Sequence, residues 1–497
     1  MNVVLFTDVA DSIGYGKYGG TYKIATEIRK AGYTCQVVDH MLFLGLDRLK
    51  KIVDKFVTQD TIMIGVSCTL NEVRDHLQNV IHFWGLSDNE FTELLAYIKT
   101  KGNAKIVIGG ARIHEEIDFD YVDYAVIGKA DNAVVSILEH LKYQTDLKHK
   151  QNNFTKIIYG DDYFYSQEEF KNSQIVFEEQ DIILDNEWLP LEIARGCIFS
   201  CSFCQYDLIG KKMGDWTKTA DSIYDEMMRN YKLFGTTSYM FTDELVNESV
   251  EKLQMLLSIV ERLPFKLQYT AYARIDRIAK YPEMIELLQK TGAVSLAIGI
   301  ESLNYNALLK LGKGPKPEII KETLKKCKDA WGNNVIISCS FIVGLPEETE
   351  ESIQQTFEYL LSDENPIDIF TVIPLGIRGF SRKGSTPKSK LEKNPEKYGM
   401  KIKINSWEWE NTKSGSISRN RAMQLVKEFR ALPKAKSRTI FYSSTFLGRI
   451  LSLGFTTPEV TKIVNVMSSA ETVKYRDIIQ EKARSLKNEY YRRLMEV

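Results

Sequence analysis

Three closely spaced cysteines are the strongest chemical signal in this chain of 497 residues. Cys197, Cys201 and Cys204 lie in the segment RGCIFSCSFCQ with the spacing C-x3-C-x2-C. Thiolates are soft ligands, and three of them on one short loop can hold three corners of an iron–sulfur cube. The other cysteines lie in apolar runs or helical patterns and are not grouped with the loop: Cys35, Cys68, Cys327 and Cys339. The pattern predicts a [4Fe–4S] cluster with one iron open to an outside ligand.

Zinc is the alternative occupant of such a loop, and three incidental thiols are the alternative to any metal site. A structural zinc ion also takes a fourth ligand. All the histidines fall in the first part of the chain, far from the loop in sequence: His40, His76, His82, His114, His140 and His149. The sequence therefore favours the cluster.

The cysteine loop follows the first of six apolar runs that alternate with helical patterns between residues 189 and about 380. The runs are LPLEIAR, TSYMFTD, KLQYTAYARI, SLAIGIES, VIISCSFIVG and IDIFTVIPL. Six parallel strands with covering helices predict a (β/α)6 partial barrel, the incomplete relative of the eight-stranded TIM barrel.

The first 150 residues show the same alternation. Their apolar runs are rich in Val and Ile and nearly continuous, as buried parallel strands are; they span 2–9, 34–40, 61–67, 104–110 and 123–128. Helical patterns lie between them, at 21–32, 46–57 and 90–102. This predicts a doubly wound, Rossmann-like α/β domain that binds ligands at the carboxyl ends of its strands, where Gly109 and Gly110 lie.

The remaining segments complete a division of the chain into four parts. Residues 151–188 are polar, aromatic and irregular, which predicts a linker. The segment after the barrel begins with a stretch rich in Lys, Ser and Pro and then becomes helical. We therefore expect a Rossmann-like domain at 1–150, a linker at 151–188, a barrel at 189–384 and a helical cap at 385–497.

Composition excludes several classes of protein. Hydrophobic residues make up 44% of the chain and charged residues 26%, which excludes a disordered, collagenous or small disulfide-stabilised chain. No apolar run is long enough for a membrane span. The first residues lack the basic start of a signal peptide, so the expected location is the cytoplasm.

Charge is unevenly distributed although the net charge is −1. Residues 383–497 carry 24 Lys and Arg against 11 Asp and Glu. Aromatic residues are interleaved with these charges: Trp407, Trp409, Phe441 and Tyr442. A basic surface with stacking rings could bind RNA, DNA or a phosphorylated substrate. The alternative, which we favour, is a set of solvated helices that closes the acidic barrel by charge attraction.

At the cysteines the sequence resembles the radical S-adenosylmethionine (SAM) enzymes, whose signature is C-x3-C-x-aromatic-C, with Phe203 in the aromatic position. The resemblance implies that the open iron binds the amino and carboxylate groups of SAM. Reductive cleavage of SAM then gives methionine and a 5′-deoxyadenosyl radical. It also implies an electron donor such as flavodoxin or ferredoxin.

The resemblance extends over 189–380 and assigns a SAM site at the strand ends. In FTDEL, Asp243 and Glu244 are the candidates to accept hydrogen bonds from the SAM amino group. Arg274 would hold the SAM carboxylate, and Glu301 would bind the ribose hydroxyls. Gly344, in FIVGLPEET, would let the backbone pass close to the adenine.

The N-terminal domain in front of this barrel resembles the cobalamin-binding domain that one class of these enzymes carries. The segment 106–141 is similar to the last third of such a domain. The resemblance implies that Gly109 and Gly110 lie against the nucleotide tail of cobalamin, and that Ser67 and Thr69 contact the same tail.

Two departures from the cobalamin pattern stand out. Ala10 occupies the histidine position of the motif that ligates cobalt, and 128–131 read Gly-Lys-Ala-Asp where Gly-Glu-Gly-Glu is usual. Many radical SAM enzymes bind cobalamin without a protein histidine. We therefore still expect cobalamin in spite of the first departure. The alternative is a vestigial domain that has lost cobalamin and now only packs against the rest of the protein. The glycine-rich loop 14–23 lacks a well-placed acidic partner, so nicotinamide binding is a weaker interpretation.

The resemblance implies an enzyme that methylates an unactivated carbon with cobalamin and SAM. Its substrate is a small molecule, peptide or nucleotide that the sequence does not specify. The segment 406–429 resembles the part that closes the open side of the barrel in this class, which would place Trp407 near the substrate entrance. The alternatives are a radical rearrangement, cyclisation or oxidation with SAM alone and, from another class, a nucleic-acid-binding module with a structural cluster.

Overall fold

The computed structural model describes the whole chain except residues 9–13, 70–71, 74–80, 83–87, 378–382, 404–405, 413–416, 440–446 and 467. The predictions for Ala10, Phe441 and Tyr442 therefore lie outside the described residues.

The N-terminal part is built on a seven-stranded sheet in the order β2-β1-β3-β6-β7-β9-β8. Its strands are β1 (Val3–Phe6), β2 (Cys35–Val38), β3 (Met63–Ser67), β6 (Lys105–Gly109), β7 (Tyr124–Ile127), β8 (Lys150–Gln151) and β9 (Lys156–Tyr159). The accompanying helices are α1 (Gly19–Lys30), α2 (Met41–Phe56), α3 (Asp88–Lys99) and α4 (Ala133–Tyr143). Strands β4 (Glu72–Val73) and β5 (Ile81–His82) form a short antiparallel pair. Every strand predicted for this domain is present and pairs in parallel, which confirms the doubly wound fold.

The first sheet extends beyond residue 150, so the linker predicted at 151–188 does not begin there. Strand β9 pairs in parallel with β7, and β8 pairs antiparallel with β9. Residues 155–159, TKIIY, are a short apolar strand whose length is too small to give a clear period. The rest of the segment contains η1 (Gly160–Asp162), α5 (Gln167–Phe170) and η2 (Glu179–Asp181). It contacts α1, where Arg29 makes an ion pair of 2.6 Å with Asp181.

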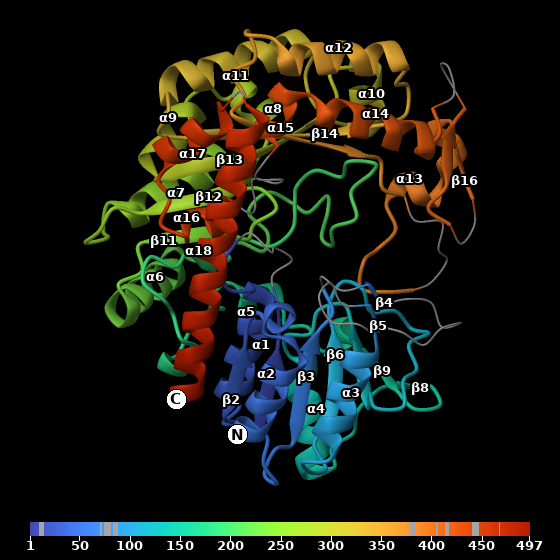
Figure 1. The fold of residues 1–497 in the computed structure, drawn as a ribbon, viewed down its shortest axis with the longest axis vertical. Helices are drawn as coiled ribbons and strands as arrows, with labels where there is room; N and C mark the ends of the chain where they lie inside the picture. Colours follow the sequence, from blue (N-terminus) through green and yellow to red (C-terminus); the bar gives the residue numbers. More distant parts are fainter. Residues whose placement is uncertain are drawn as a thin grey trace.

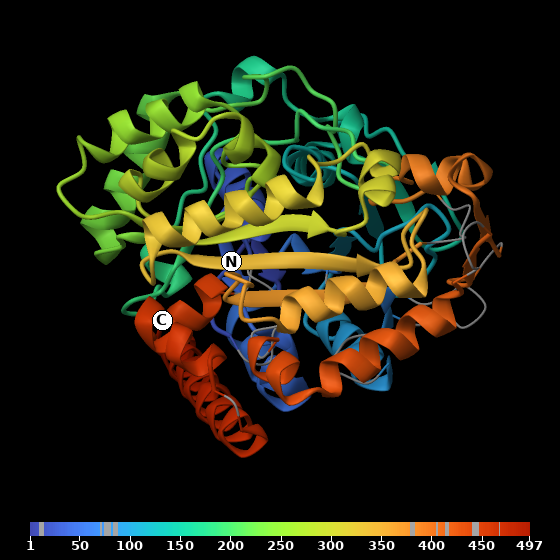
Figure 2. The same ribbon diagram turned by 90° about the horizontal axis from the view of Figure 1, so that it is seen from above.

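The second sheet has six parallel strands in sequence order. They are β10 (Leu189–Leu191), β11 (Ser238–Phe241), β12 (Gln268–Ala273), β13 (Ala293–Glu301), β14 (Ile336–Val343) and β15 (Ile369–Pro374). The helices between them are α6 (Ala220–Phe234), α7 (Val250–Val260), α8 (Ile275–Lys280), α9 (Met284–Lys290), α10 (Tyr305–Leu311), α11 (Pro317–Trp331) and α12 (Glu350–Leu361). The later helices lie along the outer side of the strands (Figure 2, yellow to orange). This is the predicted (β/α)6 partial barrel.

The C-terminal part is helical, as expected, but it starts with an antiparallel pair that the sequence did not indicate. The pair is β16 (Met400–Ile402) and β17 (Trp409–Asn411), and it follows α13 (Lys390–Lys393) and η3 (Pro395–Tyr398). The helices are α14 (Arg419–Ala431), α15 (Pro433–Arg438), α16 (Leu447–Leu451), α17 (Thr457–Val464) and α18 (Ser469–Glu496). Two of their cations pair with barrel carboxylates, Arg421 with Glu350 at 2.7 Å and Lys434 with Asp363 at 2.8 Å.

Helix α18 runs from the barrel down to the N-terminal domain, so that the two chain ends lie near each other (Figure 1). Tyr490 of α18 is fully buried there, and its hydroxyl accepts a hydrogen bond of 2.9 Å from the backbone N–H of Asp39. Lys17 lies over the same ring, 4.6 Å from its centroid, and pairs with Asp39 at 3.0 Å. None of the described helices is long and apolar enough to cross a membrane.

Candidate functional site

The cysteine loop leaves the end of β10 and folds back on itself. The backbone N–H of Cys197 donates to the carbonyl of Leu208 at 3.1 Å, and that of Gly210 donates to the carbonyl of Cys197 at 2.8 Å. Gly196 has φ +82°, and a Cβ there would lie 2.6 Å from Cβ of Leu208. Only glycine fits this turn, which brings the loop against residues 208–210.

The three loop cysteines lie close enough for Cys201 and Cys204 to affect the pKa of Cys197. Burial raises the pKa of Cys197 and Cys204, and the neighbouring thiols raise it further, while Arg274 lowers that of Cys197. Arg274 donates from Nη1 to Sγ of Cys201 at 3.2 Å. Across the residues that the structure describes, no three His, Cys, Asp or Glu side chains converge to hold a single metal ion. Three thiols on one short loop are soft ligands, and this donor chemistry fits an iron–sulfur cluster.

The remaining cysteines are buried away from the loop. Burial alone raises the pKa of Cys68 and Cys327 to about 12, and it does the same for Cys35 with smaller effects from neighbouring charges. Cys339 is buried on β14. Thiols in such surroundings are poor nucleophiles and poor metal ligands.

The structure separates the two acidic candidates of FTDEL. Asp243 accepts hydrogen bonds from the backbone N–H groups of Ile193 and Ala194, at 2.8 and 3.0 Å, and its charge pairs with Lys252 at 2.7 Å. Its carboxylate is therefore already occupied in holding the base of the cysteine loop. Asp243 therefore positions the loop in this structure, and its role at the SAM amino group remains a prediction.

Glu244 faces the other way, into a cavity. Its Oε2 accepts a hydrogen bond of 2.8 Å from the backbone N–H of Gly196. Burial raises its pKa to about 7, and the nearby charge of Asp243 acts in the same direction. A ligand cation beside it would favour the charged form, so Glu244 is the better candidate for the SAM amino group.

Arg274 lies at the cluster side of the site. Its Nε and Nη2 donate to both carboxylate oxygens of Asp276, at 2.9 and 2.7 Å, and its guanidinium lies 3.7 Å from the ring centroid of Phe199. The donors predicted to hold the SAM carboxylate are thus engaged with Asp276 and Cys201 in this structure.

Glu301 ends β13 with φ +72°, at a register shift against β14. Its Oε1 accepts from Nζ of Lys313 at 2.6 Å and its Oε2 from Oγ of Ser340 at 3.2 Å. Nζ of Lys313 also lies 5.6 Å from the ring centroid of Phe203 in the cysteine loop. Sequence reasoning missed Lys313 and Ser340, because neither lies in a motif or beside Glu301 in the chain.

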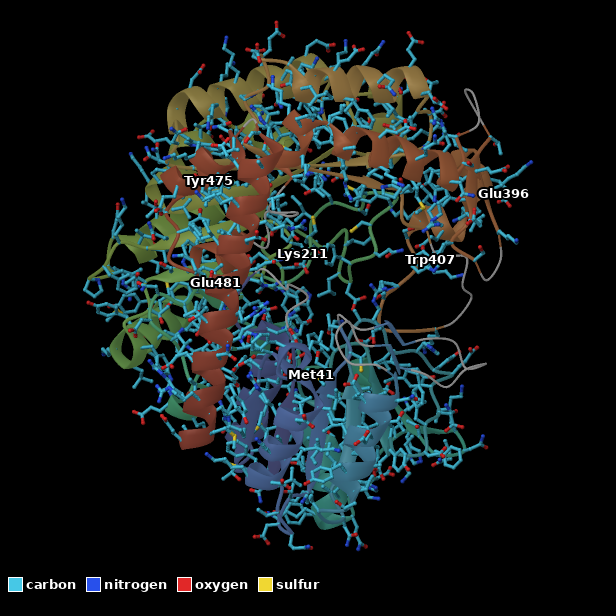
Figure 3. The ribbon with its side chains drawn as sticks, viewed as in Figure 1. Met41, Lys211, Glu396, Trp407, Tyr475 and Glu481 are labelled. Atoms are coloured by element: carbon cyan, nitrogen blue, oxygen red, sulfur yellow. The ribbon has the colours of Figure 1, made fainter. Side chains whose placement is uncertain are left out.

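Gly344 makes a close approach to an aromatic side chain of the C-terminal part. It has φ +93°, and a Cβ there would lie 2.1 Å from Cη2 of Trp409. The indole of Trp409 is 2% exposed and donates to the carbonyl of Leu375 at 2.9 Å. Trp409 therefore explains why position 344 has no side chain, and the approach of adenine to this backbone remains a prediction. Trp407 lies at the level between the two sheets, on the side opposite α18 (Figure 3).

The N-terminal domain presents its own polar edge at the carboxyl ends of β3 and β6. The hydroxyl of Tyr18 donates to Oγ1 of Thr69 at 3.2 Å, and the hydroxyls of Ser67 and Thr69 are 3.5 Å apart. Gly110 has φ +117°, and a Cβ there would lie 2.6 Å from the backbone nitrogen of Thr69. The backbone of Thr69 thus excludes a side chain at position 110, whether or not a ligand is bound. A Cβ at Gly109 would meet only Val126, at 3.9 Å.

A cavity of about 770 Å³ lies between the two sheets and joins these two edges. It brings together the following predicted residues: Ser67, Thr69, Gly109 and Gly110 with Phe203, Cys204 and Glu244. The other predicted residues that the structure describes do not line it: Cys197, Cys201, Asp243, Arg274, Glu301 and Gly344. Sequence reasoning missed Glu192 and Arg195, which line the cavity just before the first cysteine.

A second, polar hollow of about 700 Å³ adjoins the cavity, because the two share Gly128, Asp207 and residues 385–387. Lysines from two parts of the chain line it: Lys148, Lys383, Lys388 and Lys393. It offers a polar entrance to a mostly apolar chamber.

Comparison with known proteins finds a match over most of the barrel. Residues 191–360 match the sequence model of the Radical SAM superfamily. Bacteriochlorophyllide d C-12(1)-methyltransferase of Chlorobaculum tepidum is 24% identical over 194 residues, 38% of this chain and 40% of that protein. The anaerobic magnesium-protoporphyrin IX monomethyl ester cyclase of Cereibacter sphaeroides is 26% identical over 168 residues, 33% of this chain and 26% of that protein. The chain thus matches less than half the length of these curated relatives.

Two solved structures share the whole architecture. The radical SAM methyltransferase TsrM of Kitasatospora setae, solved with cobalamin and a [4Fe–4S] cluster, aligns with a TM-score of 0.59 and 14% identity over 98% of this chain and 99% of that one. The cobalamin-dependent radical SAM enzyme OxsB aligns with a TM-score of 0.63 and 14% identity over 97% and 72%. At this identity the likeness is one of fold. Both the predicted fold class and the predicted resemblance are confirmed.

Proposed function

Because the chain carries a radical SAM domain joined to a Rossmann-like domain, we propose that it is a cobalamin-dependent methyltransferase acting on an unactivated carbon. Cys197, Cys201 and Cys204 would hold the cluster, and Glu244 and Glu301 would bind SAM. When bound, the reduced cluster supplies the electron that cleaves SAM to methionine and a 5′-deoxyadenosyl radical, and methylcobalamin supplies the methyl group.

The cavity between the domains is the observation that carries this proposal. One wall consists of the residues expected at a cobalamin tail, with Ser67, Thr69 and Gly109 at strand ends of the first sheet. The opposite wall contains Cys204 and Glu244. A corrin on the first wall would therefore share one chamber with SAM on the second, which a transfer between them requires.

The protein's own groups orient the reactants and exclude water. Apolar side chains from both sheets line the chamber, among them Phe6, Ile108, Val126, Ile342 and Leu375. A radical in such surroundings is kept from water and from groups that would quench it. The same surface favours a substrate with a large apolar part, which enters through the polar hollow beside the cavity.

The test is anaerobic reconstitution with iron, sulfide and hydroxocobalamin, followed by desalting and incubation with SAM and dithionite. We expect the protein to retain a corrin, to release 5′-deoxyadenosine and to methylate the bound corrin from labelled SAM. Release of 5′-deoxyadenosine without corrin retention would instead support a cobalamin-independent rearrangement, cyclisation or oxidation.

A further inference from the structure

The outer face of the cysteine loop, away from the interdomain cavity, contains a hollow of about 560 Å³. We call it the lysine hollow, because Lys310, Lys390 and Lys397 line it. Its floor is made by residues 198–200, which lie between Cys197 and Cys201 in the chain, and by Ser202, which follows Cys201. None of its described lining residues is acidic.

Hydrogen bonds between three chain segments hold this hollow in shape. Ser202 donates from its backbone N–H to the carbonyl of Leu311 at 3.0 Å and accepts at its own carbonyl from Leu391 at 2.8 Å. Lys390 donates from Nζ to Oγ of Ser200 at 2.8 Å. The C-terminal part is thereby fixed directly to the cysteine loop, so the hollow is formed before any partner arrives.

Two of the three lysines are available to a partner. Among the described residues no carboxylate pairs with Lys310 or Lys397. Leu309, next to Lys310, is 57% exposed and adds an apolar contact. Glu396, which precedes Lys397, lies at the outer edge of the molecule and does not line the hollow (Figure 3). The surface of the lysine hollow is therefore basic with a small apolar part.

Reductive cleavage of SAM needs one electron for each turnover, and nothing in the chain itself supplies it. That electron must reach the loop cysteines from a carrier outside, across as little protein as possible. A partner seated in the lysine hollow would touch residues 198–200 and Ser202, which are the immediate chain neighbours of Cys197 and Cys201.

Resting on the proposed radical SAM function, we propose that the lysine hollow docks an acidic one-electron carrier protein, such as a flavodoxin. The carrier's redox group loses one electron. That electron breaks the bond between sulfur and C5′ of SAM, and the products are methionine and the 5′-deoxyadenosyl radical. Lys310 and Lys397 would steer the acidic face of the carrier to the loop, and the attraction would weaken as salt rises.

RNA is the competing partner for a basic surface, but the hollow has little for bases to stack on. The guanidinium of Arg274 already lies against the ring of Phe199, 3.7 Å from its centroid, and Tyr398 is buried. Single-strand binding relies on exposed rings along a charged groove. The features of the hollow therefore favour a compact acidic protein.

The test uses a recombinant bacterial flavodoxin of net negative charge and the cluster-loaded protein. The variant Lys310→Glu/Lys397→Glu reverses two unpaired charges and leaves Lys390 in place. The matched control is Lys232→Glu/Lys266→Glu, two exposed lysines at the opposite end of the barrel strands. Calorimetry gives the flavodoxin affinity at low and high salt, and stopped-flow absorbance gives the rate of cluster reduction by flavodoxin and by dithionite.

We expect the hollow variant to lose at least about tenfold in flavodoxin affinity and in reduction rate by flavodoxin. Reduction by dithionite, and SAM cleavage with dithionite, should be unchanged in both variants. Equal losses in the control, unchanged flavodoxin affinity in the hollow variant, or tighter binding of single-stranded RNA than of flavodoxin to the wild type would overturn the docking proposal. Absence of SAM cleavage with dithionite in the wild type would instead overturn the proposed function.

Discussion

Nη2 of Arg195 lies 3.3 Å from Oδ1 of Asp131, so the residue two places before the first cysteine is tied to the N-terminal domain. Arg195 also pairs with Glu192 at 2.6 Å, and Asp131 accepts a hydrogen bond of 2.9 Å from the hydroxyl of Tyr165. Burial opposes the charge of Asp131, but the guanidinium still lowers its pKa. The contact couples the start of the cysteine loop to the end of β7 and fixes one side of the cavity.

Replacing Arg195 should therefore destabilise the protein. In Arg195→Met the Asp131 carboxylate stays buried without its cation, and we expect the free energy of unfolding to fall by about 3 kcal/mol. Urea titration measures this. The control is Arg262→Met, which breaks the exposed pair with Asp221 and should cost less than about 1 kcal/mol. Similar losses in the two variants would contradict a coupling role for Arg195.

The cysteine loop makes a prediction about metal content. Replacing Cys197, Cys201 and Cys204 with Ala should remove about four irons per chain after anaerobic reconstitution. The control Cys339→Ala changes a buried thiol away from the loop and should leave the iron content unchanged. Iron and zinc are measured by mass spectrometry. One zinc per chain in the wild type, lost in the triple variant, would refute the cluster.

A buried carboxylate in the loop after β14 predicts a pH dependence of stability. Glu348 accepts from the backbone N–H groups of Gly344 and Leu345, at 2.9 and 3.0 Å, and from Ser302 at 2.7 Å. Burial outweighs these bonds and raises its pKa to about 7, from 4.5 in the unfolded chain. The folded state then binds the proton more tightly, so this group stabilises the fold below pH 4.5 and that stability is lost as pH rises toward 7.

Glu348→Gln keeps the shape and the acceptor oxygen and removes the titration. The stability of this variant relative to the wild type should rise by about 3 kcal/mol between pH 4.5 and pH 7, the amount that a shift of this size represents. Urea titrations across that range measure the difference. A difference that does not change with pH would show that Glu348 is charged throughout.

The sequence was sufficient for the main strands of both sheets, but it did not indicate the β16–β17 pair, the strand β9 or the side-chain partners at the site. Apolar runs bounded by Gly and Asp indicated the strands, and cysteine spacing indicated the loop, because both signals are local. Asp243 and Glu244 could not be separated, because they are neighbours after a strand end and only the fold shows that Asp243 binds backbone N–H groups while Glu244 lines the cavity. The packing of Trp409 on Gly344 and of Tyr490 on Asp39 joins segments far apart in the chain, and no local pattern indicates such contacts.

The ion pair between Glu301 and Lys313 predicts how SAM binding should respond to substitution. Glu301→Gln keeps the size of the side chain and loses its charge, so SAM affinity should fall by about 1–3 kcal/mol, the value of a hydrogen bond to a charged group. Calorimetry under anaerobic conditions measures this. Ser340→Ala removes only a neutral neighbour of the carboxylate and should cost less. Equal SAM affinity in Glu301→Gln and the wild type would mean that Glu301 serves only to pair Lys313.

The last prediction concerns cobalamin, and the structure determines which glycine can test it. Gly110→Val would clash with the backbone of Thr69 whether or not a corrin binds, so its effect could not be assigned to the ligand. Gly109 lines the cavity and has room for a Cβ. In Gly109→Val the side chain would occupy space on the wall where the nucleotide tail is expected.

We expect the wild type, mixed with hydroxocobalamin and desalted, to retain about one corrin per chain, and Gly109→Val to retain much less with unchanged iron content. Ser67→Ala should weaken retention by a smaller factor, because it removes one hydroxyl and adds no bulk. Since alanine cannot ligate cobalt, the Co(II) resonance spectrum should show no histidine nitrogen from the motif that contains Ala10. Full retention in Gly109→Val would place the corrin elsewhere. A wild type that cleaves SAM but retains no corrin would remove the basis for methyl transfer and leave the N-terminal domain as a wall of the substrate chamber.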